Sequence, residues 1–184
     1  MTTYTLHTKD TAPDNAKPLL ENSQSAFGMI PNLHAVMAES PELLKGYQLL
    51  HELAQKTSFN ADELTVVWQT INVEHECHYC VPAHTGIAKS MNVSDELIEA
   101  LRNAEELKDS KLNALRNTVL AVTRGRGVIG DKEQKAFMDA GYTAQNMLEI
   151  ILILSQKVMS NYTNHLAETP VDEAFEKFAW EPKK

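Results

Sequence analysis

The chain has 184 residues, with 17 Lys or Arg against 25 Asp or Glu, and a formal net charge of −8. Its 43% apolar and 23% charged residues are typical of a globular protein with its own core, and they exclude disordered and collagen-like chains. Because binding to phosphate backbones or anionic lipid requires positive charge, the acidic balance argues against nucleic acid and membrane partners. We expect one cytoplasmic domain over residues 1–184, with loosely held ends at 1–14 and 181–184 and neither a signal peptide nor a membrane span.

Apolar residues recur with helical rather than strand spacing, which predicts an all-α, single-domain helical bundle. Pro41 can open an early helix, because the first turn leaves amide positions unpaired anyway. Asn60 and Glu63 have the spacing of a capping box and predict the start of a second helix, with Trp68 on its core face. This helix runs toward the two cysteines.

Helices continue in the second half of the chain. Ser94 is a typical N-cap and predicts the start of a third helix. Apolar positions within 112–122 predict a fourth helix. Three glycines predict a loop over 124–130, and Asp131 with Gln134 then has the spacing of a capping-box variant at the start of another helix. All of these elements fit the all-α prediction.

The last long helix is predicted to begin at Thr143 and to end before Pro170. Its inward stripe is expected to contain Met147, Ile151, Leu154 and Val158, and to continue through Asn161 or Tyr162 to His165. Residues 147–159 are so apolar that one small domain is not expected to cover them. We therefore predict a homo-oligomer.

The most informative pattern is Cys77-x-x-Cys80-x-x-x-His84. Pro82 belongs in the first turn of a helix, so this helix should start near Cys80 and place Cys80 and His84 on one face. A helix start and a neighbouring imidazole both favour the thiolate of Cys80, which is the form that attacks a peroxide or a disulfide. Cys77 lies before the helix, near acidic residues, so Cys80 is expected to react first.

Two other interpretations of this pattern remain open. The cysteines can be small core residues without reactivity. With His84 they can also provide three zinc ligands, and His75, His78 or His165 could supply a fourth. In that case the chain would be a thiol- or zinc-based sensing or interaction protein.

The motif together with its flanks resembles the AhpD-like alkyl hydroperoxidase branch of the carboxymuconolactone decarboxylase family, in its peroxidase-related members. The flanking strings that carry the resemblance are MIPNL at 29–33, SPELL at 40–44, AGYT at 140–143, NYTNH at 161–165 and TPVD at 169–172. A lactone decarboxylase of the same superfamily is an alternative, although the cysteine pair has no assigned part in that chemistry.

The resemblance implies an all-helical, oligomeric peroxidase that needs no metal or other cofactor. It assigns attack on an organic hydroperoxide to Cys80, which becomes a sulfenic acid, and closure of a disulfide to Cys77. His84 would hold or relay the proton. The partners implied are a hydroperoxide substrate and an external dithiol or protein reductant.

The chain departs from the family pattern at two positions. The relay glutamate of the family falls on Thr65, which cannot titrate near neutral pH, and the nearest acid is Glu63. We name Glu63 as a candidate catalytic residue, although its role in the capping box is already a sufficient reason for an acid at this position. The family's histidine between the cysteines falls on Tyr79, with His78 one position earlier.

Overall fold

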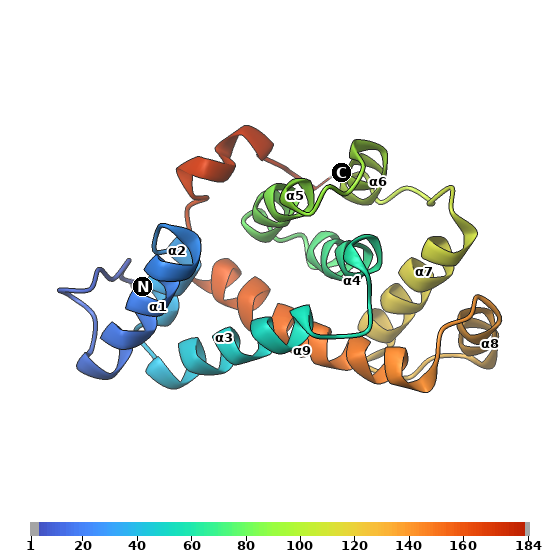
Figure 1. Ribbon diagram of the computed structural model, residues 1–184, viewed down its shortest axis with the longest axis horizontal. Helices are drawn as coiled ribbons and strands as arrows, with labels where there is room; N and C mark the ends of the chain where they lie inside the picture. Colours follow the sequence, from blue (N-terminus) through green and yellow to red (C-terminus); the bar gives the residue numbers. More distant parts are fainter. Residues whose placement is uncertain (1–3, 183–184) are drawn as a thin grey trace.

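Helices make up most of the computed structural model, which describes residues 4–182 (Figure 1). The α-helices are α1 (Lys17–Phe27), α2 (Asn32–Met37), α3 (Pro41–Gln55), α4 (Ala61–Glu74), α5 (Cys80–Ser90), α6 (Asp95–Arg102), α7 (Ser110–Gly125), α8 (Asp131–Asp139) and α9 (Ala144–Ala167). Two 3-10 helices, η1 (Asp14–Ala16) and η2 (Glu173–Phe178), complete the set, and no strand occurs within residues 4–182. The predicted all-α fold class is confirmed.

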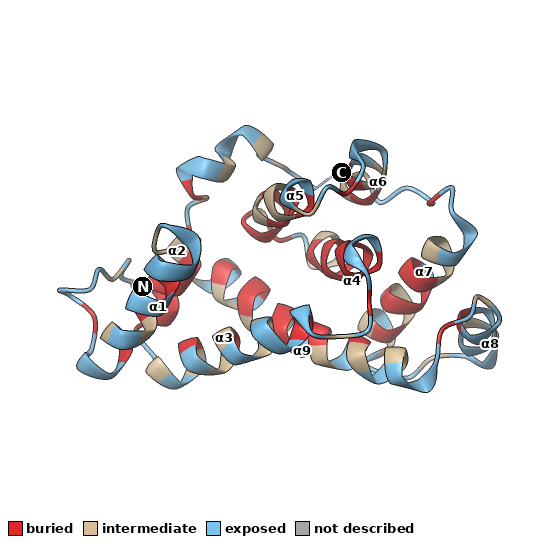
Figure 2. Ribbon diagram, viewed as in Figure 1, coloured by how far each residue is buried: buried red, intermediate tan, exposed pale blue. Residues whose placement is uncertain are grey.

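Helix α9 runs along the molecule and connects its two ends (Figure 1). One part of it packs beside α3 and α2, and α4 lies in the middle, against α5, α7 and α9. Buried residues gather on the helix faces that turn toward this centre (Figure 2). At the end of the chain, η2 lies against α5.

Side-chain caps fix several helix starts. Asn60 and Glu63 form the predicted capping box at α4, and Thr143 forms one with Asn146 at α9. At α8 the predicted capping-box variant is wrong, because Gly130 occupies the N-cap position and no side-chain cap forms there. Glycine has no side-chain oxygen to accept the free amides of the first turn.

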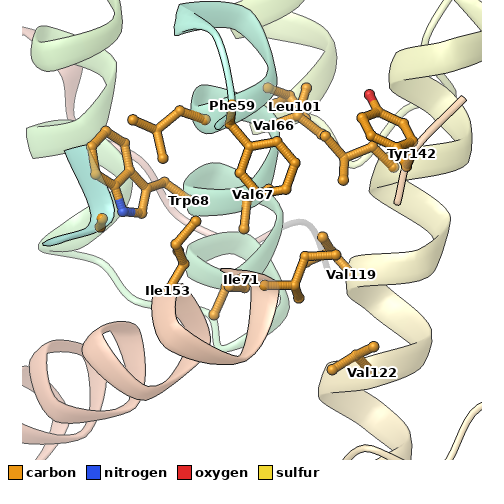
Figure 3. Packing of buried hydrophobic residues seen from close by; sticks show 14 of the residues in the cluster. Phe59, Val66, Val67, Trp68, Ile71, Leu101, Val119, Val122, Tyr142 and Ile153 are labelled. Atoms are coloured by element: carbon orange, nitrogen blue, oxygen red, sulfur yellow. The ribbon is translucent and has the colours of Figure 1, made fainter. Parts of the chain in front are cut away.

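The larger apolar cluster joins α4, α7, α8 and α9 (Figure 3). Trp68, predicted to be a core residue, is 1% exposed, and Phe137 and Ile153 are fully buried. Burying a side chain of this size stabilises the fold by about 1.5–3 kcal/mol. A second cluster around Tyr47, Cys77 and Cys80 includes residues of α1, α2 and α3.

The stripe predicted for the last helix is confirmed only in part, because Asn161 is buried and Met147 and Leu154 pack against the apolar cluster, whereas Ile151 and His165 are exposed. The buried residues of α9 are Ile150, Ile153, Gln156, Lys157, Ser160, Asn161 and Asn164. Ile151 is 42% exposed and His165 is exposed. Apolar residues occur on more than one face of the first half of α9, and the buried face of its second half is polar, so hydrophobic spacing selected some positions that are exposed.

Residues 1–3 and 183–184, which belong to the ends predicted to be loose, lie outside the described residues. Nearer the core, the His7 amide donates to the Ala35 carbonyl at 3.2 Å. Trp180 Nε1 donates to the Arg102 carbonyl at 2.9 Å. Within residues 4–182, no helix combines the length and the apolar character that a membrane crossing requires.

Candidate active site

The two cysteines lie in the turn between α4 and α5. Glu76 adopts the left-handed conformation with φ 52°, which ends α4 and redirects the chain. The Cys77 amide then donates to the Asn72 carbonyl at 3.0 Å. Helix α5 begins at Cys80, with Pro82 in its first turn. The predicted helix start is therefore confirmed.

Both thiols are buried and unbridged. The amide of Cys80 donates to Sγ of Cys77 at 3.3 Å, so the first amide of α5 is hydrogen-bonded to the sulfur of Cys77 and not to that of Cys80. The Asn164 side chain donates to Sγ of Cys80 at 3.2 Å and lies 4.0 Å from Sγ of Cys77. An amide donor from α9 thus contacts the sulfur that the sequence identifies as the reactive one.

His84 is buried, and its hydrogen-bond partner is a lysine of α9. Nζ of Lys157 donates to Nε2 of His84 at 2.8 Å, and Lys157 is 0% exposed. Among the described residues, no hydrogen bond joins His84 to either sulfur. We expected the Cys80 sulfur within hydrogen-bond reach of the His84 ring or one water away; in the structure Cys80, His84 and Lys157 line the same cavity.

These neighbours change the acidity of the two thiols in opposite directions. Burial alone would raise the pKa of Cys80, but the hydrogen bond from Cys77, the charge of Lys157 and the amides of Asn161 and Asn164 lower it to about 5. The hydrogen bond between the two sulfur groups, with burial, raises the pKa of Cys77 well above its ordinary value. Cys80 is therefore the thiolate of the pair at neutral pH.

Burial also disfavours the protonated forms of the two basic groups of the site, His84 and Lys157. It lowers the pKa of His84 well below its ordinary value, and the charge of Lys157 adds to this effect. Burial lowers the pKa of Lys157 too, while the two cysteines act in the opposite direction and favour its charged form. The charged state of Lys157 and the thiolate of Cys80 support each other.

A buried amide network connects the cysteine turn to α4 and α9. Asn161 Nδ2 donates to Asn72 Oδ1 at 3.0 Å, and Asn72 Nδ2 donates to Gln69 Oε1 at 3.0 Å. Gln69 in turn donates to the Val81 carbonyl at 3.2 Å. Since buried amides without partners are costly, this network fixes the first turn of α5 relative to α9.

Cys80 lines an apolar cavity of about 230 Å³. The other lining residues are Phe27, Met29, Pro31, Leu33, His34, Tyr47, His51, Tyr79, Ala83, His84, Ile87, Lys157, Ala174 and Phe175. No Asp or Glu of the described chain is among them. Phe175 of η2 packs so closely on α5 that a Cβ added to Gly86 would lie 2.7 Å from its ring. The cavity therefore suits an uncharged organic molecule.

Tyr79, which lies between the two cysteines, anchors the C-terminal segment. Its hydroxyl donates to Oδ2 of Asp172 at 2.5 Å and accepts from the Leu33 amide at 3.2 Å. Asp172 also accepts from the Asn32 amide at 2.8 Å. Tyr79 therefore links the cysteine turn to α2 and to the segment before η2.

The remaining candidates lie apart from this arrangement. Glu63 makes its capping bond and an ion pair with Lys111 at 2.7 Å, and none of its polar contacts involves the cysteines. His78 Nε2 donates to the Thr169 carbonyl at 3.0 Å, and His165 is exposed. The structure thus brings together Cys77, Cys80 and His84 but not Glu63. No group of three or more His, Cys, Asp or Glu side chains suited to a metal ion occurs among residues 4–182.

Lys157 and Asn164 were not identified from the sequence as buried residues, whereas Asn161, or Tyr162, was expected to continue the inward stripe of the last helix. Lysine and asparagine on a helix usually face water, so Lys157 and Asn164 gave no signal of burial. Their spacing does place them on one face: positions 157, 161 and 164 are separated by four and three residues. Together with the cysteine motif, that pattern is the signal that could have revealed them.

Comparison with known proteins shows structural likeness at low sequence identity. No family model matches the chain, and no curated protein sequence matches it significantly. One similar crystal structure is the alkylhydroperoxidase AhpD core of an uncharacterized peroxidase-related protein from Ralstonia eutropha JMP134. Its TM-score is 0.82 at 18% identity, with 94% of this chain and 93% of that chain covered.

Two further solved structures have the same architecture. An uncharacterized peroxidase-related protein from Silicibacter sp. TM1040 gives a TM-score of 0.77 at 17% identity, with 95% of each chain covered. The debrominase Bmp8, as a cysteine-to-alanine variant in complex with 2,3,4-tribromopyrrole, gives 0.73 at 15% identity, covering 96% of this chain and 95% of that one. The chain has the AhpD-like all-α fold of the peroxidase-related proteins.

Proposed function

We propose that the protein is a thiol-dependent peroxidase that reduces organic hydroperoxides. The observation that carries this proposal is the position of Cys80, a sulfur with a low pKa in the wall of an apolar cavity, beside the buried Lys157 and His84. A thiolate is the nucleophile for peroxide oxygen. An apolar cavity of this size favours an alkyl or aryl hydroperoxide over hydrogen peroxide.

The cysteine pair supplies the rest of the cycle. Cys80 attacks the hydroperoxide and becomes a sulfenic acid, and Cys77, three residues away, condenses with it to form a disulfide and water. An external dithiol or a protein reductant then restores both thiols. The protein acts in the cytoplasm, where such reductants keep thiols reduced.

The test is turnover of cumene hydroperoxide with dithiothreitol as electron donor. Wild type should show saturable turnover, and Cys80→Ser should reduce it by more than about 1,000-fold, because serine provides no thiolate. Ser90→Ala, an exposed position at the end of α5, is the matched control and should keep the wild-type rate. Equal turnover by wild type and Cys80→Ser would refute the proposal.

Reductive debromination is a second candidate. It is favoured by the structural likeness to a debrominase bound to tribromopyrrole and by the aromatic lining of the cavity, Phe27 and Phe175 included. In that reaction the dithiol would lose two electrons and become a disulfide, while a carbon–bromine bond becomes carbon–hydrogen and bromide leaves. Release of bromide from 2,3,4-tribromopyrrole, in the absence of hydroperoxide turnover, would establish it.

We also propose that the protein is a homo-oligomer. Leu148 and Leu166 of α9 are 71% and 70% exposed, which is unusual for leucines on a helix with so many buried residues. Light scattering at micromolar concentration should give a mass above the 20.6 kDa of one chain. A purely monomeric mass would contradict this assembly.

A further inference from the structure

A buried lysine without a carboxylate partner lies beside the proposed peroxidatic cysteine. Lys157 is 0% exposed. Within residues 4–182 its side chain forms no ion pair with Asp or Glu. Because an isolated buried ammonium is costly and would lose its proton, the charged form of Lys157 depends on a negative group nearby, and the two cysteines are the groups that favour it. Cys80 is the thiolate in the same cavity.

The other ionisable groups around Lys157 do not compete for this role. They are Cys77 next to Cys80, Tyr79 before α5, His84 in α5, His51 and Tyr47 in α3, and His34 in α2. Burial lowers the pKa of His34 to about 3 and that of His51 to about 4, so both are neutral at pH 7. Burial raises the pKa of Tyr47 and of Tyr79, which are neutral too. Lys157 and Cys80 are thus the charged groups of the cavity.

The lysine also determines which nitrogen of His84 carries the hydrogen. An ammonium donates hydrogen bonds and cannot accept them, so Nε2 of His84 is the acceptor and Nδ1 carries the hydrogen. Nδ1 is buried and has no hydrogen-bond partner among the described residues. An unpaired buried donor on a residue that lines the cavity points to a ligand as its partner.

We propose that Lys157 is a positioning residue with two tasks: its charge holds Cys80 as the thiolate, and its hydrogen bond holds His84 as the tautomer that donates a proton to the leaving alkoxide. This inference rests on the proposed peroxidase function. It makes His84 a proton donor, in place of the base expected from the sequence. In the family that the sequence resembles, a glutamate completes the proton relay, and its position is Thr65 in this chain. Here Lys157 completes the relay instead.

The reaction balances with these groups. The sulfur of Cys80 bonds to the terminal peroxide oxygen, and the O–O bond breaks to leave an alkoxide. The alkoxide takes the Nδ1 hydrogen of His84 while Nε2 takes one from Lys157, so the products are an alcohol, a sulfenic acid and a neutral lysine. Cys77 then forms the disulfide and releases water. After reduction by the external dithiol, the Cys80 proton returns to Lys157 through His84.

The first test is the titration of the Cys80 thiolate, followed by its ultraviolet absorbance and by the pH dependence of iodoacetamide labelling. Lys157→Met keeps the length of the side chain and removes the charge, so the midpoint should rise from about 5 by at least about 2 pH units. Lys135→Met, which removes an exposed lysine of α8, should leave the midpoint unchanged. An unchanged midpoint in Lys157→Met would overturn the first task.

The second test separates charge from proton delivery. Lys157→Arg keeps the positive charge, so the thiolate midpoint should stay within about 1 pH unit of wild type. A guanidinium does not give up its proton, so single-turnover oxidation of Cys80 by cumene hydroperoxide should fall by at least about 100-fold. Oxidation at the wild-type rate in Lys157→Arg would overturn the second task.

A third measurement needs no variant. Nitrogen chemical shifts of His84 in the reduced wild type should identify the neutral form with hydrogen on Nδ1, and hydrogen on Nε2 would contradict the proposed tautomer. These readouts also separate this inference from the proposed function. A shifted thiolate midpoint in Lys157→Met, together with no oxidation of wild type by any hydroperoxide, would support the first task while refuting the second task and the peroxidase function.

Discussion

The two halves of α9 are buried in different surroundings. In the first half, Ile150 and Ile153 are fully buried in the apolar cluster shared with α4 and α7. In the second half, the fully buried residues are Gln156, Lys157, Ser160, Asn161 and Asn164. Apolar burial stabilises a fold, whereas polar burial costs free energy that hydrogen bonds only offset. One helix therefore contributes stability at one end and chemistry at the other.

The largest expected effect on stability comes from the apolar half. Ile153→Ala removes three carbons from a fully buried position and should lower the free energy of unfolding by about 2–5 kcal/mol, because the neighbours cannot fill the cavity it leaves. Urea unfolding measures the loss. The iodoacetamide labelling rate of Cys80 in the folded variant should equal that of wild type. A slower rate would mean that the two halves are not independent.

The site region should make stability depend on pH. His34 is 5% exposed, and burial lowers its pKa to about 3, whereas the unfolded chain binds a proton near the ordinary value of 6.5. Below pH 6.5 the unfolded state binds more protons than the folded state. The stability contributed by neutral His34 is therefore fully present above pH 6.5 and is lost as the pH falls toward 3. The loss from this histidine should be roughly 2 kcal/mol between pH 7 and pH 5.

Replacing this histidine provides the control for the pH effect. His34→Gln should weaken the pH dependence of the free energy of unfolding, obtained from urea unfolding, by about 1 kcal/mol per pH unit over that range, while Ile153→Ala lowers this free energy equally at each pH. An unchanged slope in His34→Gln would show that the imidazole is accessible to protons in the folded state.

A smaller effect is expected at the start of α9. The Thr143 side chain accepts from the Asn146 amide and closes the capping box of the apolar half. Thr143→Ala should therefore cost about 1 kcal/mol in urea unfolding. The Cys80 thiolate midpoint should not move, because the cap lies at the end of the helix remote from Lys157. A loss above about 3 kcal/mol would indicate that the cap supports more than the first turn.

The smallest expected change in stability is at the centre of the polar half. Lys157→Met removes a buried ammonium, and Cys80 can take up a proton so that no charge remains buried alone. The free energy of unfolding at pH 7 should then change by less than about 1 kcal/mol. Thermal unfolding checks this. A loss as large as that of Ile153→Ala would show that Lys157 is needed for folding rather than for chemistry.

The sequence predicted the helical fold better than it predicted the site. Local signals are short in range, so the capping box at Asn60, the helix start at Thr143 and the effect of Pro82 on the start of α5 could be predicted. Helices α1 and α2 were not predicted, since neither has a side-chain N-cap. Their ends depend on packing and on backbone contacts.

Within the site, residues close in sequence were easier to identify than those brought together by packing. Cys77, Cys80 and His84 lie within eight positions, whereas Lys157 reaches His84 from 73 residues away. Nothing local in the sequence indicates that Lys157 is buried, because lysine on a helix usually faces water. Glu63 was chosen as the nearest acid in sequence, and its partner proved to be Lys111.

The position of the first oxidised sulfur tests the account most directly. Cys77→Ser and Cys80→Ser would each be treated with a limiting amount of cumene hydroperoxide, trapped with dimedone and mapped by mass spectrometry. We expect a sulfenic acid on Cys80 in Cys77→Ser and unreacted Cys77 in Cys80→Ser, because Lys157 and Asn164 stabilise the thiolate of Cys80. A sulfenic acid on Cys77 with Cys80 left reduced would contradict it.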